Sequence, residues 1–392
     1  MNFRLAAAIS RATRAVRANN LLEGMRRIQE AVSRPEPDKR QAPRPAPRPA
    51  GPIDSSVGPA RRQPTQRQRR PLPEVLGILN RGLAGDAFRS LPGGKRVVPA
   101  PIPEGAEFAE RRFSCDAGTR TYKVYIPASV RNGRKASGLI VMLHGCKQDP
   151  DDFATGTKMN AEGETHDLIV AYPCQPSSAN PSSCWNWFNP ADQSRGAGEP
   201  AILAGLTRAL SSEFGLDREN VYVAGLSAGG AMAAVMGATY PDLYSAVGVH
   251  SGLAHRAAND VVTAFAAMRG DLSANQAISR SRATSESPLL RTIVFHGSAD
   301  RTVHPRNGDV IISATAAFDA GPVVEDRGSA HGRSYVRTTF AGSGEKPAVE
   351  HWLIQDSGHA WCGGDPNGSF ADGLGPNASA EMVRFFLASR GC

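Results

Sequence analysis

A serine flanked by glycines lies where a strand-like run meets a helix-like run. Residues 225–229 read Gly-Leu-Ser-Ala-Gly; the apolar residues 221–224 precede them and the small residues 230–239 follow. Glycines on both sides permit a turn so tight that a Cβ would crowd the neighbouring backbone. Such a turn exposes the serine at the end of a strand, and the helix points its first N–H groups toward the same place. The pattern predicts that Ser227 is a nucleophile.

A serine hydroxyl needs a base to become nucleophilic, and the base needs an acid that orients it. With this arrangement of strand, turn and helix, both are expected later in the chain, the acid first. Residues 292–295 form a strand-like apolar run, and Asp300 follows in the next loop. Residues 349–354 form another strand-like run, followed by a glycine-flanked loop that contains His359. We predict that Ser227, Asp300 and His359 form a catalytic triad.

Other residues compete for the two later roles. Asp356 and Asp365 are alternative acids, and Asp300 could instead cap a helix or stabilise a turn. The chain has nine histidines, of which His304 and His351 are the main rivals of His359. His351 lies inside a strand pattern, which does not suit a base that must move over the serine.

Two backbone N–H groups are expected to stabilise the oxyanion. One belongs to the residue after the nucleophile, Ala228, and the other to an earlier loop between a strand and a helix. Residues 139–143 form a continuous apolar run typical of a buried parallel strand, and His144–Gln148 follow it. The N–H of Cys146 is therefore the second candidate, although an ordinary glycine turn would have the same sequence.

These motifs resemble polyhydroxybutyrate depolymerase-like esterases, close to the feruloyl and acetylxylan esterases of the α/β-hydrolase superfamily. The matching segments span residues 105–390 and are Leu143–Gln148, Cys184–Phe188, Val223–Gly230, His296–Asp300 with Val303–Pro305, and Gly358–Trp361. The Cys-Trp-Asn-Trp-Phe segment is the most specific of them. The resemblance implies the same triad and a substrate groove lined by Trp185, Asn186, Trp187, Phe188 and Trp361. Read without it, these aromatic residues are ordinary packing.

The order of the apolar runs predicts the fold class, α/β with a mostly parallel, doubly wound sheet. Helical patterns alternate with strand-like ones, as that class requires. The expected strands lie near 121–126, 139–143, 168–172, 221–225, 246–249, 292–295 and 349–354, and the expected helices near 200–214, 230–239, 306–318 and 380–388. Residues 105–392 are long enough for one catalytic domain.

The residues before this domain differ in composition. Residues 35–104 include a run rich in proline and arginine, which predicts a disordered linker. Residues 1–74 carry 16 Lys and Arg against 6 Asp and Glu, a net charge of +10, whereas the whole chain has +8. The remainder is therefore −2, so no large cationic face is expected on the catalytic domain and no specific nucleic-acid binding.

Residues 1–34 are expected to form a basic amphipathic helix. Leu5, Ile9, Val16, Met25 and Ile28 recur near helical spacing, with arginines among them. Such a helix could contact an anionic surface, such as a membrane or a polymer granule, or could be merely solvated or self-associating. The longest early apolar run, residues 5–9, is too short for a secretion signal, and no transmembrane span is expected.

All six cysteines fall within the catalytic region, which favours disulfides and an oxidising compartment. Pairing cannot be derived from the sequence; Cys146 with Cys184 and Cys362 with Cys392 are possibilities. Because the cysteines and the missing signal disagree, an extracellular or periplasmic location competes with a cytoplasmic one. No spacing resembles a zinc site or a dinucleotide or phosphate loop, so no metal and no cofactor are expected.

The sequence therefore predicts a serine esterase that works through an acyl-enzyme. The favoured substrates are short polyhydroxyalkanoate esters or oligomers, and feruloylated or acetylated xylan is the alternative. Extracellular depolymerases of the family that the chain resembles usually carry a substrate-binding module after the last helix; none is expected here, which disfavours attack on crystalline polymer. A function of another class is interaction with a granule or membrane surface through the basic N-terminal region. The oligomeric state is left open.

Overall fold

The computed structural model describes residues 100–271, 290–315, 324–341 and 347–388. All of them belong to one compact unit, residues 76–392. The predicted N-terminal helix, the linker up to residue 99 and the possible partner Cys392 lie outside the described residues.

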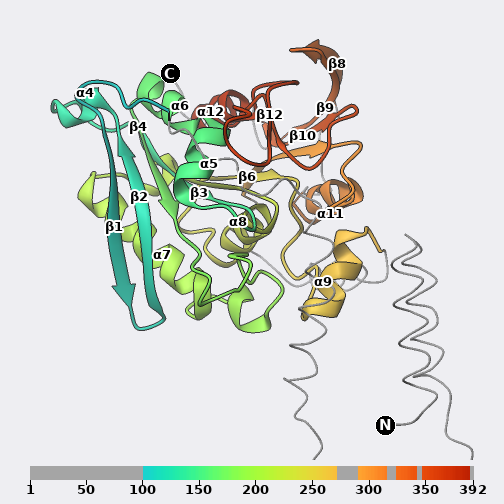
Figure 1. Ribbon diagram of the computed structural model, residues 1–392, viewed down its shortest axis with the longest axis horizontal. Helices are drawn as coiled ribbons and strands as arrows, with labels where there is room; N and C mark the ends of the chain where they lie inside the picture. The colour runs from blue at the N-terminus through green and yellow to red at the C-terminus, as the bar shows by residue number, and fades with distance from the viewer. Residues whose placement is uncertain (1–99, 272–289, 316–323, 342–346, 389–392) are drawn as a thin grey trace, which may run out of the picture. The chain divides into compact units, whose positions relative to one another are not determined.

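A ten-stranded sheet forms the centre of this unit (Figure 1). The six central strands β4, β3, β5, β6, β7 and β10 are parallel, and two antiparallel strands border each side. In spatial order the strands are β1 (Glu107–Cys115), β2 (Gly118–Ile126), β4 (Leu168–Pro173), β3 (Gly138–Leu143), β5 (Val221–Leu226), β6 (Ala246–His250), β7 (Arg291–Gly297), β10 (Pro347–Ile354), β9 (Arg333–Ala341) and β8 (Val324–Ala330). Two short strands, β11 (Trp361–Cys362) and β12 (Ala371–Asp372), pair separately.

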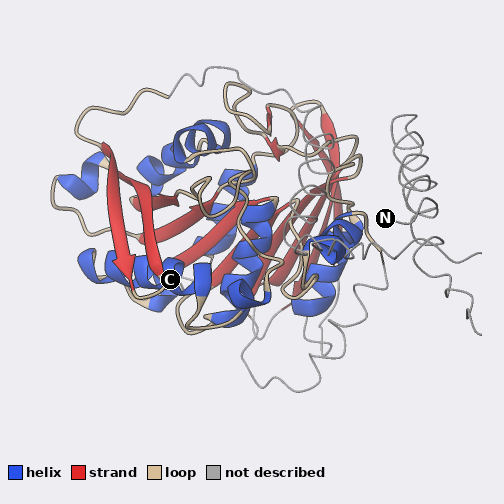
Figure 2. Ribbon diagram, turned by 60° about the horizontal axis from the view of Figure 1, so that its bottom comes forward, coloured by secondary structure: helices blue, strands red, loops and turns tan. Residues whose placement is uncertain are grey.

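Helices cover both faces of the sheet (Figure 2). Alternate residues of β3 divide between two apolar cores, with Leu139 in one and Ile140 in the other, as expected for a strand buried on both sides. The first core contains residues of α7 (Gly198–Glu213), α8 (Ala228–Thr239) and α11 (Arg306–Thr315), and the second contains residues of α5 (Pro150–Thr157), α6 (Met159–His166) and α12 (Ala378–Leu387). The remaining helical segments of the described residues are α4 (Ala128–Arg131), α9 (Val261–Met268) and the 3₁₀ turns Pro190–Gln193 and Arg218–Asn220.

The predicted fold class is confirmed, and each predicted strand is present within a few residues of its expected position. The expected helix at 306–318 is α11, which ends at Thr315 where the described residues stop. Strands β1, β8 and β9 were not predicted. Their polar, partly exposed sequences lack the continuous apolar runs of the central strands, and β8 owes its place to its pairing with β9.

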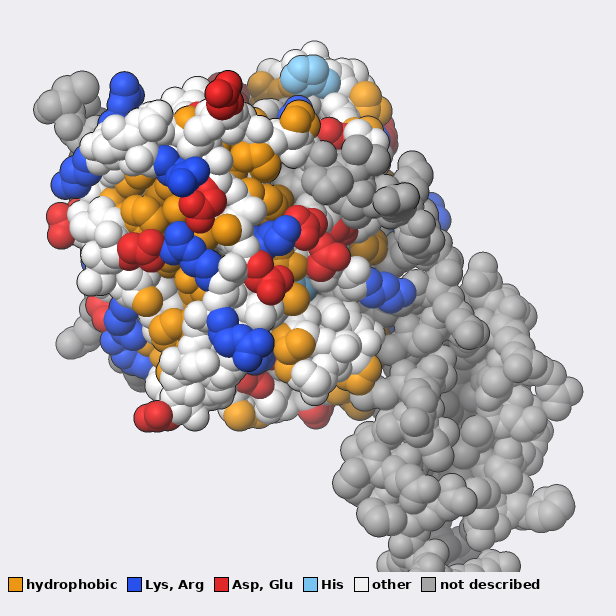
Figure 3. Space-filling model, turned by 60° about the vertical axis from the view of Figure 1, so that its left-hand side comes forward, with side chains coloured by type: hydrophobic (Ala, Val, Ile, Leu, Met, Phe, Trp, Pro, Cys, Tyr) orange, Lys and Arg blue, Asp and Glu red, His pale blue; other side chains and the backbone are white. Residues whose placement is uncertain are grey.

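The side of the molecule that bears β1 and β2 carries both signs of charge. Figure 3 shows Lys and Arg interspersed with Asp and Glu on this side. Several pairs are within ion-pair distance, among them Arg111 with Glu213 at 2.8 Å and Lys123 with Asp151 at 2.5 Å. This side therefore has no uniformly cationic surface, in line with the net charge expected for residues 75–392.

Candidate active site

The turn at Ser227 has the strained geometry that its glycines suggested. Ser227 has φ 57° and ψ −120°, between the end of β5 and the start of α8. A Cβ at Gly229 would lie 1.9 Å from the carbonyl oxygen of Leu143, and one at Gly225 would lie 2.4 Å from the backbone of Gly229. Only glycine fits at these two positions, because any Cβ would clash with the neighbouring backbone. The two glycines therefore allow β5 and α8 to approach closely on either side of Ser227.

The loop after β3 lies against this turn. A Cβ built on Gly145 would stand 3.5 Å from the Cβ of Ser227, so the peptide that joins Gly145 to Cys146 is next to the serine. Among the hydrogen bonds of the described residues, none uses the N–H of Cys146. Ala228 is the first residue of α8, and the first N–H groups of a helix have no intrahelical acceptor. The two predicted oxyanion donors therefore lie in the two segments that meet at Ser227, the loop after β3 and the first turn of α8.

Asp300 and His359 lie in contact. Nδ1 of His359 is 2.7 Å from Oδ2 of Asp300, and the other carboxylate oxygen accepts the N–H groups of Thr302 and Val303, each at 2.9 Å. The rival acids lie elsewhere: Asp356 is exposed, and Asp365 accepts the N–H of Asn367. The structure therefore pairs His359 with Asp300.

Asp300 is held as a carboxylate. Burial alone would raise the pKa of Asp300, but hydrogen bonds from His296 and His359 outweigh burial and hold it well below its usual range. Nε2 of His296 is 3.5 Å from Oδ2 of Asp300 and 2.8 Å from the carbonyl oxygen of Val303. His296 was quoted only as part of a motif, and its contact with the acid could have been suspected from its place four residues before Asp300.

The rival histidines are not placed as bases. His304 is exposed, and its Nδ1 accepts the N–H of Arg306. His351 lies in β10, as predicted, and burial lowers its pKa to about 4. Neither contacts a carboxylate in the part of the chain that the structure describes.

His250, which the sequence reading missed, links the serine turn to the histidine loop. Its carbonyl oxygen accepts the N–H of Ser227 at 2.9 Å, and its Nε2 accepts the N–H of Cys362 at 3.1 Å. Burial lowers the pKa of His250 to about 3, with the nearby His296 and His359 adding to the effect. The ring is therefore neutral and can accept that bond.

The aromatic residues expected to line a groove are mostly buried. Trp185 and Trp361 are 0% and 1% exposed, so these two indoles have no surface to offer a substrate, and for them the prediction needs correction. Trp185 packs on the His144 ring, at a centroid distance of 5.7 Å, and Trp361 stacks on the His250 ring at 5.1 Å. Both support residues next to the site.

The other members of that set differ from one another. Trp187 is 5% exposed, and Phe188 is half-buried with its ring 5.6 Å from that of Trp187. Asn186 is half-buried, but its amide side chain donates to Glu199 at 2.7 Å. Phe188 is thus the predicted contact with the most accessible aromatic surface.

One disulfide joins two of the predicted segments. Cys146 and Cys184 are bonded, with a Cα–Cα distance of 4.2 Å, so the oxyanion loop is tied to the aromatic segment. Among the described residues, Cys115, Cys174 and Cys362 have no disulfide partner.

Polar contacts that the sequence did not reveal hold the same loop from the other side. Gln148 accepts the N–H of Gly145 at 2.9 Å and donates to the carbonyl oxygen of Ser369 at 2.9 Å. Ser369 also donates from its N–H and its hydroxyl to Asp152. Its neighbour Phe370 has its ring 6.4 Å from that of His359. No motif marks residues that are 221 positions apart, so only the fold brings them together.

Within the described ranges, no group of three metal-ligating side chains comes together. No helix in those ranges is both long and apolar enough to span a bilayer.

The sheet of this chain is mostly parallel and has helices on both faces, and a serine lies on the turn from β5 to α8. Together these features define the α/β-hydrolase fold. The chain belongs to the esterase PHB depolymerase family, whose model matches residues 120–327. The resemblance seen in the sequence motifs is thereby confirmed.

The chain is similar to several named esterases. It is 31% identical to poly(3-hydroxyalkanoate) depolymerase C of Paucimonas lemoignei, over 62% of this chain and 59% of that protein. It is also 31% identical to feruloyl esterase B of Neurospora crassa, over 43% of this chain and 60% of that protein. The chain thus spans about three fifths of the length of the curated relatives it matches.

The fold has a counterpart among solved structures. An acetyl xylan esterase from Aspergillus awamori superposes with a TM-score of 0.52 at 21% identity, covering 68% of this chain and 93% of that one. This likeness supports the fold alone.

Proposed function

We propose that this protein is a serine esterase that hydrolyses carboxylic esters through an acyl-enzyme. The observation that carries the proposal is the 2.7 Å contact between His359 and Asp300, in loops that follow β10 and β7. These strands are parallel to β5, so their ends lie at the edge of the sheet where Ser227 begins its turn.

The chemistry follows from that contact. The Asp300 carboxylate accepts a hydrogen bond from the Nδ1–H of His359, which leaves the Nε2 lone pair to take the proton of the Ser227 hydroxyl. The serine oxygen attacks the ester carbonyl, and the N–H groups of Ala228 and Cys146 stabilise the oxyanion. His359 then protonates the leaving alcohol, and water releases the acid from the acyl-enzyme by the same steps.

The first substrate class is short polyhydroxyalkanoate esters and oligomers. The likeness to a poly(3-hydroxyalkanoate) depolymerase, and membership of the esterase PHB depolymerase family, support it. The likeness to a feruloyl esterase and to an acetylxylan esterase of Talaromyces purpureogenus supports a second class, feruloylated or acetylated cell-wall esters. Both substrate classes would use the same triad.

A panel of esters tests the proposal. The full chain is incubated with p-nitrophenyl acetate and butyrate, 3-hydroxybutyrate oligomers, methyl ferulate and acetylated xylan, beside Ser227→Ala. We expect hydrolysis of at least one class, fastest with the hydroxybutyrate oligomers, and a loss of several orders of magnitude in the variant. Turnover that survives Ser227→Ala would refute the serine mechanism, and a preference for methyl ferulate or xylan would favour the second class.

We propose further that the protein works in an oxidising compartment, extracellular or periplasmic. The disulfide between Cys146 and Cys184 supports this location. The basic residues 1–34 are proposed to contact an anionic surface. Deletion of residues 1–75 would then abolish sedimentation with anionic vesicles while soluble-ester turnover is retained; unchanged sedimentation would contradict the contact.

A further inference from the structure

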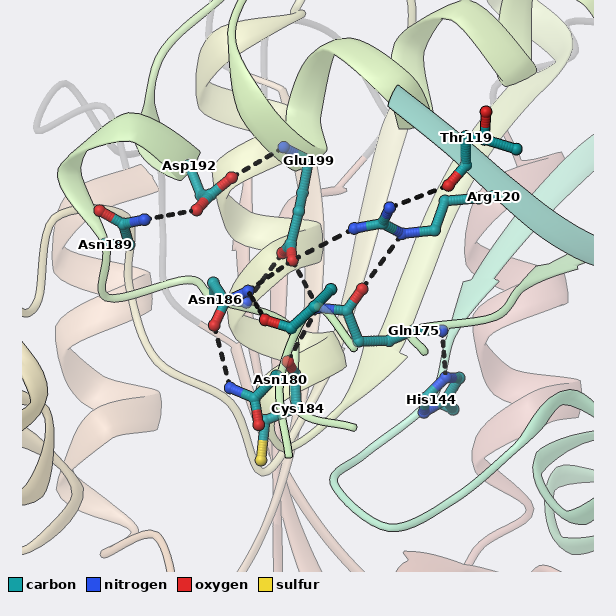
Figure 4. A network of polar contacts seen from close by, with 11 residues as sticks. Thr119, Arg120, His144, Gln175, Asn180, Cys184, Asn186, Asn189, Asp192 and Glu199 are labelled. Carbon is teal, nitrogen blue, oxygen red and sulfur yellow. Dashed lines mark hydrogen bonds and ion pairs between the residues drawn. The ribbon is translucent and has the colours of Figure 1, made fainter. Parts of the chain in front are cut away.

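Glu199 is a buried carboxylate that the mechanism above does not use. It lies in the first turn of α7, and its side chain is 4% exposed. A buried carboxylate is costly unless hydrogen bonds compensate for the lost water. Here every contact is a donor: the N–H of Asn186 at 2.8 Å, the Nδ2 of Asn186 at 2.7 Å, the Nε2 of Gln175, and Arg120 at 3.5 Å. Figure 4 shows these groups converging on the carboxylate.

One arm of this network leads to the peptide before Cys146. The backbone N–H of Gln175 donates to Nε2 of His144 at 3.0 Å (Figure 4). Burial lowers the pKa of His144, so its ring is neutral. Because Nε2 accepts, the ring proton lies on Nδ1, which donates to the carbonyl oxygen of Gly145 at 2.8 Å. A trans peptide points its N–H opposite to its carbonyl. Fixing the carbonyl of Gly145 therefore fixes the direction of the Cys146 N–H.

The second arm reaches the same cysteine through its disulfide. Gln175 Nε2 also donates to the carbonyl oxygen of Cys184 at 3.0 Å, and Cys184 is bonded to Cys146. Two residues further on, Asn186 gives both its N–H and its amide to Glu199. The carboxylate thus anchors the segment that follows the disulfide as well as the glutamine that orients His144.

The network needs the charged form of Glu199. Burial raises the pKa of Glu199 and the nearby Asp192 carboxylate adds to the rise, while the hydrogen bonds from Asn186 and Gln175 oppose it without cancelling it. A neutral acid would place an O–H among donors. The backbone N–H of Glu199, in the first turn of α7, donates to Oδ1 of Asp192 at 2.8 Å. The hydrogen-bond network therefore also includes the N-terminal end of this helix.

We propose that Glu199 is a positioning residue for the oxyanion site: through Gln175 and Asn186 it fixes the peptide and the disulfide that aim the N–H of Cys146. This inference rests on the proposed esterase function. Glu199 does not touch the reacting atoms. Its loss should weaken binding of the transition state and leave binding of the ester itself nearly unchanged, because the N–H bonds the oxygen most strongly once it is charged.

The test compares Glu199→Gln with Glu350→Gln. Glu350, which lies in β10, is a matched control because it is 2% exposed and its side chain pairs with Arg384 of α12. Among the described residues, its side chain has no hydrogen bond or ion pair with the oxyanion loop. For each variant we measure kcat and KM for p-nitrophenyl acetate, inhibition by an alkyl trifluoromethyl ketone, and Tm. The ketone forms a tetrahedral adduct with the serine and so reports on the oxyanion site.

We expect Glu199→Gln to lower kcat by about tenfold to a hundredfold, a part of the ~10²–10³ that loss of one oxyanion donor costs. KM should change little, and the ketone should bind more weakly by the factor lost in kcat/KM. Glu350→Gln should lower Tm and leave kcat and ketone inhibition unchanged. The proposal would be overturned if Glu199→Gln left kcat and ketone inhibition unchanged. It would also be overturned if Glu350→Gln, with the same Tm as Glu199→Gln, lost kcat and ketone inhibition to the same extent.

A second variant keeps the test decisive if Glu199→Gln does not fold. Asn186→Ala removes one donor to Glu199 from a half-buried side chain and keeps the backbone bond. It should show the same pattern to a smaller degree, and a normal kcat and ketone inhibition would count against the proposal. Failure of the esterase function itself would look different: the unaltered protein would hydrolyse none of the esters, or Ser227→Ala would hydrolyse them as fast as the unaltered protein does.

Discussion

Oδ2 of Asp300 lies 2.7 Å from Nδ1 of His359, although 59 residues separate the two in sequence. The contact is buried, with the Asp300 side chain 0% exposed. If the carboxylate holds the imidazole in the tautomer that accepts the serine proton, Asp300→Asn should favour the wrong tautomer. We expect kcat for p-nitrophenyl butyrate to fall by about 10⁴-fold, as in other triads. A loss below tenfold, with the fold intact by circular dichroism, would remove Asp300 from the triad.

The same pair makes stability depend on pH. Hydrogen bonds from His296 and His359 outweigh burial and lower the pKa of Asp300. A lowered carboxyl pKa stabilises the folded state above the unfolded value, about 3.9, and the stabilisation is lost as pH falls through the folded value. The unfolding free energy of the unaltered protein should therefore exceed that of Asp300→Asn most at neutral pH, with the gap shrinking below about pH 4. Urea titrations at several pH values measure it, and a gap that widens on acidification would contradict this sign.

The two residues of this pair were found from the sequence because each follows a clear strand pattern. Their partner His296 is the penultimate residue of β7, but nothing in the sequence shows that its ring turns toward Asp300 rather than toward solvent. The loops that follow neighbouring parallel strands lie at the same edge of the sheet. The local strand patterns are therefore enough to predict that Asp300 and His359 come close together. The direction of each side chain needs the fold.

Polar groups that support the site were missed for a different reason. Glu199 and Gln175 carry no motif, and 24 residues separate them. A glutamate in a helical pattern is normally read as an exposed residue, because burial of a carboxylate needs partners that sequence spacing does not reveal. For Trp185 the error has the opposite direction: the motif predicted an exposed side chain that contacts substrate, but the indole is buried. An aromatic residue in a family-specific motif can contribute by packing as well as by contact with a substrate.

The backbone conformation of Ser227 is predicted to lower the stability of the folded protein. Its φ of 57° and ψ of −120° lie where residues with a Cβ are strained, typically by about 1–3 kcal/mol. Ser227→Gly should therefore be more stable than Ser227→Ala by about 1 kcal/mol, after the entropy that glycine adds to the unfolded chain. Chemical denaturation of the two inactive variants measures this. Equal stability would mean that the turn is not strained.

The disulfide between Cys146 and Cys184 should matter for both stability and rate. It closes a loop of 38 residues, for which the chain-entropy model gives up to about 4 kcal/mol. We expect the double variant with serine at both positions to show a lower Tm. At a temperature where it stays folded, kcat should be reduced because the Cys146 N–H is less well fixed. A folded variant with normal kcat would show that hydrogen bonds alone hold the oxyanion loop.

Gly229 should tolerate no side chain. A Cβ there would lie 1.9 Å from the carbonyl oxygen of Leu143 and 2.5 Å from that of His144. Both atoms belong to the central sheet and its following loop, so neither can move without displacing the oxyanion donor. Gly229→Ala should therefore lose more than about 3 kcal/mol of unfolding free energy, or fail to fold. Gly358→Ala is the control, since a Cβ there meets no atom within 4 Å, and it should change stability by about 1 kcal/mol or less. Equal effects of the two substitutions, measured by urea denaturation, would mean that the close approach of α8 to β3 does not constrain the fold.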